Sequence, residues 1–549
     1  MERSGTTDVL IAGAGPVGLT LAAELRRAGV SCRIVDRLPA RLPFAKAVGV
    51  QPRTLEIWDR MGLVREALEA AIAMRGQLTY VNGVEQGRFD LSLPPEVPYG
   101  FASLPQYETE RLLEEFLGRF GTGVERSAEL VSFTQDGTGV TSRLTTAYGG
   151  EEVRSRFLVG CDGAHSVVRK GLGLSFEGGA FPEEYMLADV EVGWDLPSGY
   201  GVRSTHRTGD GTIDDLLVCI PLPGAGRYRM SMMVPPELSA AHRDAGGPDD
   251  GEGVAHGLEG GTAPTLADIQ KVLDRLAPQP VTASALRWSS VFRISHRLVD
   301  RYGEGRVFVA GDAAHIHPPT GAQGMNTGIQ DACNLAWKLA SAAGDVPRPR
   351  LLASYDEERR PVGEEVVGRT VRHAAEGVQA DPSDPATLLL REAQLLVGYR
   401  DGPLVLPLPT GDDASLRPGD RVPDCGGLTD GIAAYPSRLY DLLRGRGHVL
   451  LVHGRHPAGD TAADLAAAAR ELSDGLMVAC VILPVDAPGA LDAETGLPWY
   501  RDSAGEFARL FGVREPTAFV VRPDGYLSAR LSPPTVSELT ASLRRVFGG

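Results

Sequence analysis

The segment Asp8-Val-Leu-Ile-Ala-Gly13-Ala-Gly15-Pro-Val-Gly18, close to the start of the chain, decides its fold. A short apolar run, typical of a buried strand, leads into three closely spaced glycines, and an amphipathic stretch over 19–27 follows. A second apolar run over 32–36 ends in Asp36. The order strand, glycine turn, helix, strand predicts a βαβ unit of a Rossmann-like sheet.

The glycine turn is suited to a dinucleotide. Gly13, Gly15 and Gly18 permit a tight turn and let the backbone approach a pyrophosphate, whose charge lies at a helix N-terminus. Asp36 can then bind ribose hydroxyls. A purely structural turn is the alternative, because 67 of the 549 residues are glycine. The position of this turn between a strand and a helix favours dinucleotide binding.

Two later strand-like runs also end in turns that carry an aspartate. The run 157–161 leads into Asp162-Gly163, and the run 306–310 leads into Gly311-Asp312. A Gly- and Pro-rich loop over 318–326 follows, and then a helix expected over 328–342. The backbone N–H groups of that loop, opening a helix, would stabilise an anionic ring system.

The middle of the chain has the pattern of a β-sheet with a helix. Strand-like runs occupy 215–220 and 228–234, and Thr265 begins a capping-box-like helix start. The segment 240–263 has no apolar period and predicts a mobile loop. Two sets of residues could line a substrate pocket or could equally be core packing: the stripe Tyr228, Met230, Met232, and the pair Trp288, Phe292.

The C-terminal part has a composition of its own. After residue 381, Pro, Gly and Asp become frequent, which predicts a linker, and a new unit begins at about residue 419. We expect strands at 447–452 and 476–483, helices at 462–472 and 535–546, and a hairpin over 518–528. The six cysteines form no C-x-x-C pair, so disulfide exchange by this unit is disfavoured.

Composition excludes several classes of function. Lys and Arg number 55 and Asp and Glu number 71, which gives a net charge of −16 and argues against nucleic acids and anionic membranes as partners. No apolar run reaches membrane-span length, and no signal segment is visible, so a cytoplasmic location is expected. His315 and His317 have the spacing of a metal pair, but no third ligand lies near in the sequence, and we predict no metal.

The glycine turn, Asp162-Gly163 and Gly311-Asp312 together resemble the motifs of class A FAD-dependent aromatic hydroxylases, the para-hydroxybenzoate hydroxylase-like group. The resemblance is greatest to the subgroup with a C-terminal thioredoxin-like domain, which includes phenol and pentachlorophenol monooxygenases and polyketide and rifamycin hydroxylases. It implies an α/β and α+β fold with a Rossmann-like FAD-binding domain, an interleaved β-sheet substrate domain and a thioredoxin-like α/β domain. In that last fold a cis-proline is usual at the place of Pro516.

The resemblance also implies domain limits and site residues. The FAD-binding domain would comprise 1–77, 101–180 and 290–390, the substrate domain 78–100 and 181–289, the linker 391–418, and the thioredoxin-like domain, without C-x-x-C, 419–549. Lys46 stands where many members have Arg, which changes the geometry of its contact. The implied FAD-binding residues are Gly13, Gly15, Pro16, Val17, Gly18, Asp36, Arg37, Lys46, Gln106, Asp162, Gly311, Asp312, Pro319, Gly324, Met325 and Asn326. Pro318, Pro319 and Gly321 would lie near the reactive flavin carbon.

The implied activity is monooxygenation with FAD, NADPH or NADH, and O2. A flavin C4a-hydroperoxide would hydroxylate an electron-rich aromatic compound, phenolic or of polyketide type, and no side chain of this sequence stands out as an acid–base catalyst. One alternative is Baeyer–Villiger or ring-opening oxygenation by the same flavin. Another is a non-catalytic FAD-containing binding protein. For the C-terminal unit we expect a packing role or a homodimer contact.

Overall fold

The computed structural model describes residues 6–234, 257–258, 263–344, 348–376, 383–408, 415–454, 461–486 and 496–548. The predicted mobile loop over 240–263 lies almost entirely outside these ranges. Within them, none of the helices combines the length and the apolar character that crossing a membrane requires.

A largely parallel eight-stranded sheet forms the first structural unit. Its main path is β18-β19-β11-β1-β2-β8, with β9 and β10 added as an antiparallel extension of β11. The strands β19, β11, β1, β2 and β8 are parallel to their neighbours. Their bounds are β1 (Thr7–Ala12), β2 (Cys32–Asp36), β8 (Val124–Arg126), β9 (Glu129–Gln135), β10 (Val140–Thr146), β11 (Gly149–Gly160), β18 (Gly303–Glu304) and β19 (Val307–Val309).

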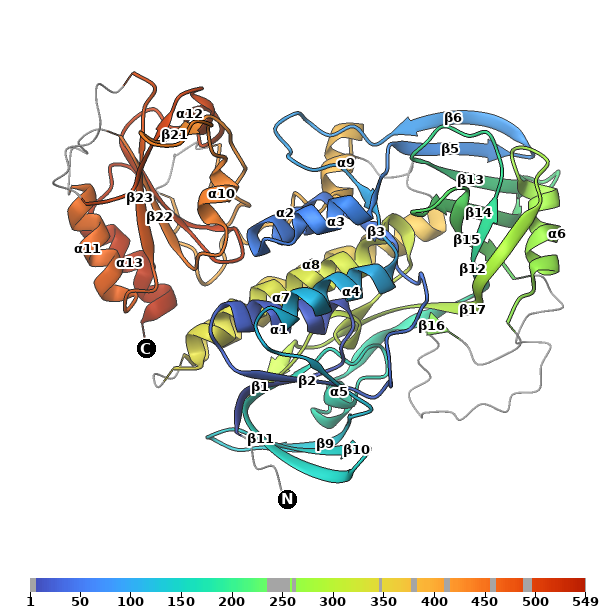
Figure 1. Ribbon diagram of the computed structural model, residues 1–549, viewed down its shortest axis with the longest axis horizontal. Helices are drawn as coiled ribbons and strands as arrows, with labels where there is room; N and C mark the ends of the chain where they lie inside the picture. Colours follow the sequence, from blue (N-terminus) through green and yellow to red (C-terminus); the bar gives the residue numbers. More distant parts are fainter. Residues whose placement is uncertain are drawn as a thin grey trace.

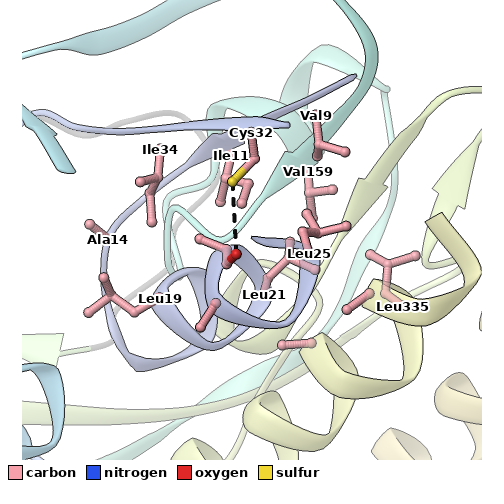
Figure 2. Packing of buried hydrophobic residues seen from close by; sticks show 14 of the residues in the cluster. Val9, Ile11, Ala14, Leu19, Leu21, Leu25, Cys32, Ile34, Val159 and Leu335 are labelled. Carbon is pink, nitrogen blue, oxygen red and sulfur yellow. Dashed lines mark hydrogen bonds between the residues drawn. The ribbon is translucent and has the colours of Figure 1, made fainter. Parts of the chain in front are cut away.

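Helix α1 (Pro16–Arg27) connects β1 to β2, which confirms the predicted βαβ unit. Leu19, Leu21 and Leu25 of this helix are completely buried. Figure 2 shows them in one cluster with Ile11 of β1 and with Leu335 from a later helix. The apolar face of α1 is therefore covered from both sides, and burial of this area is the main force that holds the helix to the sheet.

That later helix, α7 (Gln323–Ala342), starts earlier than expected. Its predicted start at Gly328 was wrong, because the helix already begins within the segment that was predicted to be a Gly- and Pro-rich loop. The structure also gives a reason for this glycine. A methyl group at Gly328 would lie 2.6 Å from Cγ2 of Val17 and 3.0 Å from Cα of Gly311, so only glycine lets α7 approach α1 this closely.

A nine-stranded sheet forms the second unit, in the order β16-β17-β12-β15-β14-β13-β5-β6, with β20 paired to β17. The expected strands at 215–220 and 228–234 are confirmed as β14 and β15. The bounds are β5 (Gly76–Val81), β6 (Val84–Asp90), β12 (Phe176–Val192), β13 (Tyr200–Arg207), β14 (Ile213–Pro221), β15 (Arg227–Met233), β16 (Gly257–Leu258), β17 (Ala283–Val299) and β20 (His315–Ile316).

Helix α6 (Leu266–Leu276) covers one face of this second sheet. It begins with the predicted capping box, in which the Thr265 and Asp268 side chains each accept a hydrogen bond from the other's backbone N–H group. Its buried side chains include Ile269 and Leu273, and they share a hydrophobic cluster with Met230 and Met232 of β15. This packing identifies the face of the sheet that points away from the first unit's sheet.

Several short elements connect the two units. One of them is a three-stranded sheet in the order β3-β7-β4. These elements and the long helix after α7 are β3 (Gly49–Val50), α2 (Pro52–Met61), α3 (Val64–Ala70), β4 (Ile72–Ala73), β7 (Ala102–Ser103), α4 (Gln106–Gly118), α5 (Val167–Gly171), η3 (Gly311–Ala313), η4 (Thr320–Ala322) and α8 (Pro349–Glu376).

The C-terminal unit contains a six-stranded mixed sheet in the order β21-β24-β23-β22-β25-β26. Separate hydrophobic clusters pack against its two faces. The bounds are β21 (Leu428–Thr429), α10 (Leu439–Leu443), β22 (Val449–His453), α11 (Ala462–Leu472), β23 (Val478–Leu483), β24 (Trp499–Asp502), α12 (Glu506–Leu510), β25 (Thr517–Val521), β26 (Leu527–Leu531) and α13 (Val536–Phe547).

The strands, helices and hairpin expected in this unit are confirmed at their predicted places. Its assignment as thioredoxin-like stays a prediction, supported by the parallel pairing of β22 with β23 and the antiparallel pairing of β25 with β22. One detail differs from that fold. In the described part of the chain the cis peptide bond joins Ser532 to Pro533, not Glu515 to Pro516.

Helices α7 and α8 occupy the middle of the molecule, with the C-terminal unit at one end and the nine-stranded sheet at the other (Figure 1). The segment predicted as a linker is packed where it is described. It follows α9 (Pro385–Glu392), and Gln394, Tyr399 and Leu404 are buried. The composition of this segment is that of a linker, but its few large side chains attach it to the core.

The close approach of α7 to α1 can be tested with two glycines that both lie inside helices. Gly328→Ala should lower the free energy of unfolding by about 1–3 kcal/mol, because the added methyl group overlaps Val17. Gly368→Ala in α8 has open space around the same atom and should instead stabilise by up to about 1 kcal/mol. Thermal denaturation of both variants measures the contrast. Equal behaviour of the two would contradict the packing described here.

Candidate functional site

The three predicted motifs meet at one edge of the eight-stranded sheet. They follow the carboxyl ends of β1, β11 and β19, which are parallel neighbours. A Cβ atom at Gly13 would lie 3.0 Å from Cα of Asp162, so the glycine turn contacts the Asp162-Gly163 turn. A Cβ atom at Gly311 would lie 2.8 Å from Cγ2 of Val17, so the third motif contacts the start of α1. Ligands of open α/β sheets bind at this edge.

The glycine turn leaves room for a ligand at one position only. A Cβ atom at Gly18 would lie 2.0 Å from the carbonyl oxygen of Gly13, and Gly13 itself has a φ of +100°. Around Gly15, by contrast, no atom lies within 4 Å of such a Cβ. Gly15 is the N-cap of α1, and no side chain caps that helix start. The open space and the free N–H groups at this helix start fit the pyrophosphate of FAD.

Asp36 has two backbone partners in addition to any ligand. Its Oδ2 accepts a hydrogen bond from the backbone N–H of Ala14 at 2.7 Å, and its Oδ1 accepts one from Leu38 at 2.9 Å. The carboxylate is thus fixed beside the glycine turn at the end of β2. Arg37, the next residue, is exposed. Contacts of these two side chains with FAD stay predictions.

The two carboxylate oxygens of Asp162 differ, because one accepts hydrogen bonds within the described chain and the other does not. Its Oδ2 accepts hydrogen bonds from the backbone N–H groups of Val167 and Val168, at 2.8 and 3.2 Å, and so caps α5. Its Oδ1 is buried without a hydrogen-bond partner among the described residues. Burial raises the pKa of this carboxyl above its usual value. A buried acceptor of this kind is an unmet hydrogen-bonding group, which a bound ligand can satisfy.

The loop over 318–326 turns sharply and then opens α7. Gly321 has a φ of +72° and Ala322 a φ of +54°, and no side chain caps the helix start that follows. Gly324, Met325 and Asn326 form the first turn of α7, where backbone N–H groups have no partner within the helix. This arrangement fits the electron-rich edge of a flavin ring, and contact of these residues with the ring stays a prediction.

The side chain of Asn326 has a structural role that the sequence did not reveal. Its Nδ2 donates to the carbonyl oxygens of Gly49 and Ala322 at 2.9 and 2.7 Å. Its Oδ1 accepts from the backbone N–H of Gln51 at 3.0 Å and from Oγ1 of Thr54 at 2.7 Å. All its groups are therefore used within the chain, so only the backbone of this residue remains for a ligand. Gln51 and Thr54 give no motif that could have identified them.

Asp331 fixes the Gly311-Asp312 turn from behind. Its Oδ2 accepts from the backbone N–H of Gly311 at 3.1 Å and from Nε2 of His315 at 2.8 Å, and its Oδ1 accepts from Nε of Arg359 at 2.7 Å. Burial acts to raise the pKa of Asp331, but the nearby Arg359 and His315 keep it below the usual value. The sequence reasoning missed both Asp331 and Arg359, because charged residues within helices carry no motif that distinguishes them from solvent-facing charges, and Arg359 lies in the charged run 356–360.

The two histidines of the H-x-H pair have separate partners. His315 donates to Asp331, whereas Nδ1 of His317 lies 2.8 Å from the carbonyl oxygen of Pro318. Burial lowers the pKa of His317 to about 4, so this ring is neutral at pH 7. Both rings thus take part in shaping the loop next to the Gly311-Asp312 turn.

The segment 44–48 lies between the loop before α7 and the nine-stranded sheet. The backbone N–H of Ala47 donates to Oε1 of Gln106 at 3.2 Å, and the carbonyl oxygen of Lys46 accepts from Nη2 of Arg229 at 3.2 Å. A Cβ atom at Gly49, just beyond the segment, would lie 2.5 Å from Cβ of Ala322. Of the predicted residues, Gln106 thus contacts the segment that contains Lys46, and this segment ends next to the loop over 318–326.

The five predicted substrate residues divide between the two faces of the nine-stranded sheet. Trp288 stacks on Phe44 with ring centroids 5.0 Å apart, and Phe292 belongs to the same cluster. Met230 and Met232 lie on the opposite face against α6, and Tyr228 packs at the edge of that cluster. These contacts favour core packing for the stripe Tyr228, Met230, Met232. Only the face of Trp288 and Phe292 adjoins the segment 44–48.

Comparisons with known proteins agree with this geometry. The family model described as "FAD binding domain" matches residues 6–370. Anhydrotetracycline monooxygenase of Streptomyces rimosus is 34% identical over 98% of this chain and 99% of its own length. Pentachlorophenol 4-monooxygenase of Sphingobium chlorophenolicum is 30% identical over 96% of this chain and 94% of its own.

A solved structure extends the likeness to the whole fold. The ternary complex of aklavinone-11 hydroxylase with FAD and aklavinone superimposes with a TM-score of 0.74, covering 100% of both chains at 25% identity. The fold is thus that of the FAD-dependent hydroxylases, with a Rossmann-like domain and an interleaved sheet domain. The chain belongs to the FAD-binding-domain family of flavin-dependent aromatic and polyketide monooxygenases.

Proposed function

We propose that the chain hydroxylates an electron-rich aromatic substrate, of phenolic or polyketide type, with FAD as cofactor and NAD(P)H and O2 as co-substrates. The observation that carries the proposal is the meeting of three turns, which the sequence predicts to bind FAD, and an uncapped helix start at one sheet edge. FAD, when bound, supplies the electron transfer and the oxygen activation. The chain's own residues hold the pyrophosphate and the ring and keep water out.

Support for an aromatic substrate comes from the sheet face beside the segment 44–48. Trp288, Phe44 and Phe292 form an aromatic cluster there with Leu187, and aromatic rings pack favourably against one another. The names of the relatives, anhydrotetracycline and pentachlorophenol monooxygenases, point to the same class of substrate. We infer that the substrate ring lies between this cluster and the flavin.

Two arginines on that face favour a substrate that reacts as an anion. Arg229 is buried, its Nε has no hydrogen-bond partner among the described residues, and burial lowers its pKa to about 10. Arg203 lies on the same face, and burial lowers its pKa as well. Both still carry a charge at pH 7. A buried cation without a carboxylate partner stabilises a nearby phenolate, whose ring is more electron-rich than that of the phenol.

The test of this function is single-turnover kinetics on purified protein reconstituted with FAD. We expect NADPH or NADH to bleach the yellow colour of the flavin, and a suitable phenol or polyketide to accelerate the bleaching. Reoxidation by O2 should then give a product with one added oxygen, and NMR of its carbon skeleton separates hydroxylation from ring insertion. A bound flavin that neither nucleotide reduces, with any member of a phenol and polyketide panel, would refute the proposal.

A substitution at Gly15 tests the position of the pyrophosphate. Because the protein itself leaves space for a methyl group there, Gly15→Ala should leave the Tm of the FAD-free protein unchanged. Its affinity for FAD should fall by about tenfold or more, because the methyl group occupies the ligand's place. Fluorescence titration with FAD measures the affinity. Gly123→Ala, at an exposed glycine with equally open surroundings, is the control and should bind FAD as the parent does.

The assignment of the substrate to one face of the nine-stranded sheet can also be tested. Trp288→Ala should raise the KM for the aromatic substrate by about tenfold or more, since it removes a stacked ring from the substrate face. Met230→Ala should leave that KM unchanged and lower the free energy of unfolding by about 2–5 kcal/mol. Steady-state kinetics and thermal denaturation of both variants are the measurements. A raised KM for Met230→Ala would show instead that the stripe Tyr228, Met230, Met232 lines the substrate site.

A further inference from the structure

A buried cluster of four charged side chains joins the C-terminal unit to α7 and α8. Arg522 and Asp524 lie in residues 522–526, the turn between β25 and β26, which we call the docking turn. Nη1 and Nη2 of Arg522 donate to the two carboxylate oxygens of Glu358 on α8 at 2.6 and 2.8 Å. Nζ of Lys338 on α7 donates to the same carboxylate at 2.8 Å. With two cations and two anions, the cluster is neutral and almost completely excluded from water.

Asp524 attaches the docking turn directly to α7. Its Oδ2 accepts from Nε1 of Trp337 at 3.1 Å and from Nδ2 of Asn334 at 3.3 Å, besides its pair with Arg522. Asn334 and Lys338 are four residues apart and therefore lie on one face of the helix. The docking turn thus fixes both the rotation and the axial position of the C-terminal half of α7.

The same two helices hold the Gly311-Asp312 turn. Asp331 lies one turn of α7 before Asn334 and accepts from the backbone N–H of Gly311. Arg359, adjacent to Glu358 on α8, donates to Asp331 and, through Nη2, to the carbonyl oxygen of Thr327 at 3.1 Å. On α7 the contacts with the docking turn therefore follow directly after the contacts with the site, and on α8 the two kinds of contact are made by the adjacent residues Glu358 and Arg359.

A second connection runs through α2. Nη2 of Arg53 donates to the carbonyl oxygen of Asp524 at 2.8 Å, and Nη2 of Arg60 donates to that of Pro523 at 2.7 Å. The start of the same helix contacts the first turn of α7, because Oγ1 of Thr54 donates to Oδ1 of Asn326. The docking turn thus contacts α2 as well as α7, and α2 in turn contacts the uncapped start of α7.

We propose that Arg522 and Asp524 are positioning residues for the FAD site. A charge left unpaired in such a cluster is far costlier than at the surface, so the cluster is satisfied in one arrangement of α7, α8 and the docking turn. In that arrangement Asp331 meets Gly311 and the first turn of α7 faces the flavin ring. The inference rests on the proposed FAD site and assigns the C-terminal unit a part in it.

The decisive variant is Asp524→Asn. It keeps the size of the side chain but removes its charge, and it can place amide N–H groups opposite the N–H donors of Asn334, Trp337 and Arg522. We expect its dissociation constant for FAD to rise by about tenfold. Hydrogen exchange of the FAD-free protein should become faster over 309–316 and 323–331, where Asp331 and Gly311 are joined. The exchange measurement requires no bound flavin, so it reports on this coupling even where the proposed oxygenation fails.

Asp502→Asn is the matched control. Asp502 is also a buried aspartate of the C-terminal unit, but within the described residues its carboxylate accepts only from the backbone N–H groups of Phe507 and Ala508 of that unit. This variant should lower the Tm without changing FAD affinity or exchange over 309–331. If Asp524→Asn behaves in the same way as this control, the docking turn has only a stabilising role and the proposal is overturned.

Two further variants keep the test decisive. Lys338→Met combined with Asp524→Asn restores a neutral cluster and should recover FAD affinity to within about threefold of the parent. Arg522→Lys keeps the charge but loses the two-pronged contact with Glu358, and it replaces Asp524→Asn if that protein is insoluble. It must then show weaker FAD binding and faster exchange over 309–316. Parent-like values of both quantities would overturn the proposal.

Discussion

The carboxylate of Asp331 is the contact on which the arrangement of the site depends. It is completely buried, and it accepts hydrogen bonds from the backbone N–H of Gly311 and the ring of His315, in one segment, and from Arg359 of α8. A buried carboxylate is stable only when its oxygens are satisfied. The partners of Asp331 therefore cannot move independently, and the position of the Gly311-Asp312 turn is determined by the position of α7.

Glycine makes this arrangement sterically possible. Gly311 and Gly328 lie against Val17 at distances that no Cβ atom would permit, so α1, α7 and the third motif share one contact. Two helix starts, those of α1 and α7, are thereby brought to the same sheet edge, and neither has a capping side chain. Such uncapped helix starts suit the negative charge of a dinucleotide and of a reduced ring, which supports the proposed FAD site.

The sequence predicted the local elements well, because strand and helix periodicity and turn residues depend on near neighbours. The βαβ unit, α6 with its capping box and the hairpin of the C-terminal unit all follow from such patterns. It misplaced the start of α7, where the reason for Gly328 is a contact with residues far away in the chain. It also left the faces of the nine-stranded sheet undecided, because alternation shows that Met230 and Arg229 point to opposite sides but not which side meets the site.

The charged residues that the sequence reasoning passed over are those that connect distant segments. Glu358, Lys338 and Arg522 show no motif, since nothing in the sequence distinguishes them from charged residues that face solvent, and Glu358 lies inside the charged run 356–360. A cluster of apolar residues in their place would give as much stability or more, because desolvation of charges is costly. Apolar side chains, however, can shift past one another at little cost. Buried ion pairs are satisfied only at one position of α7 relative to α8 and the docking turn. The proposed FAD site requires that position, because its donors include the backbone N–H groups at the start of α7, and the position of α7 sets the direction of these groups.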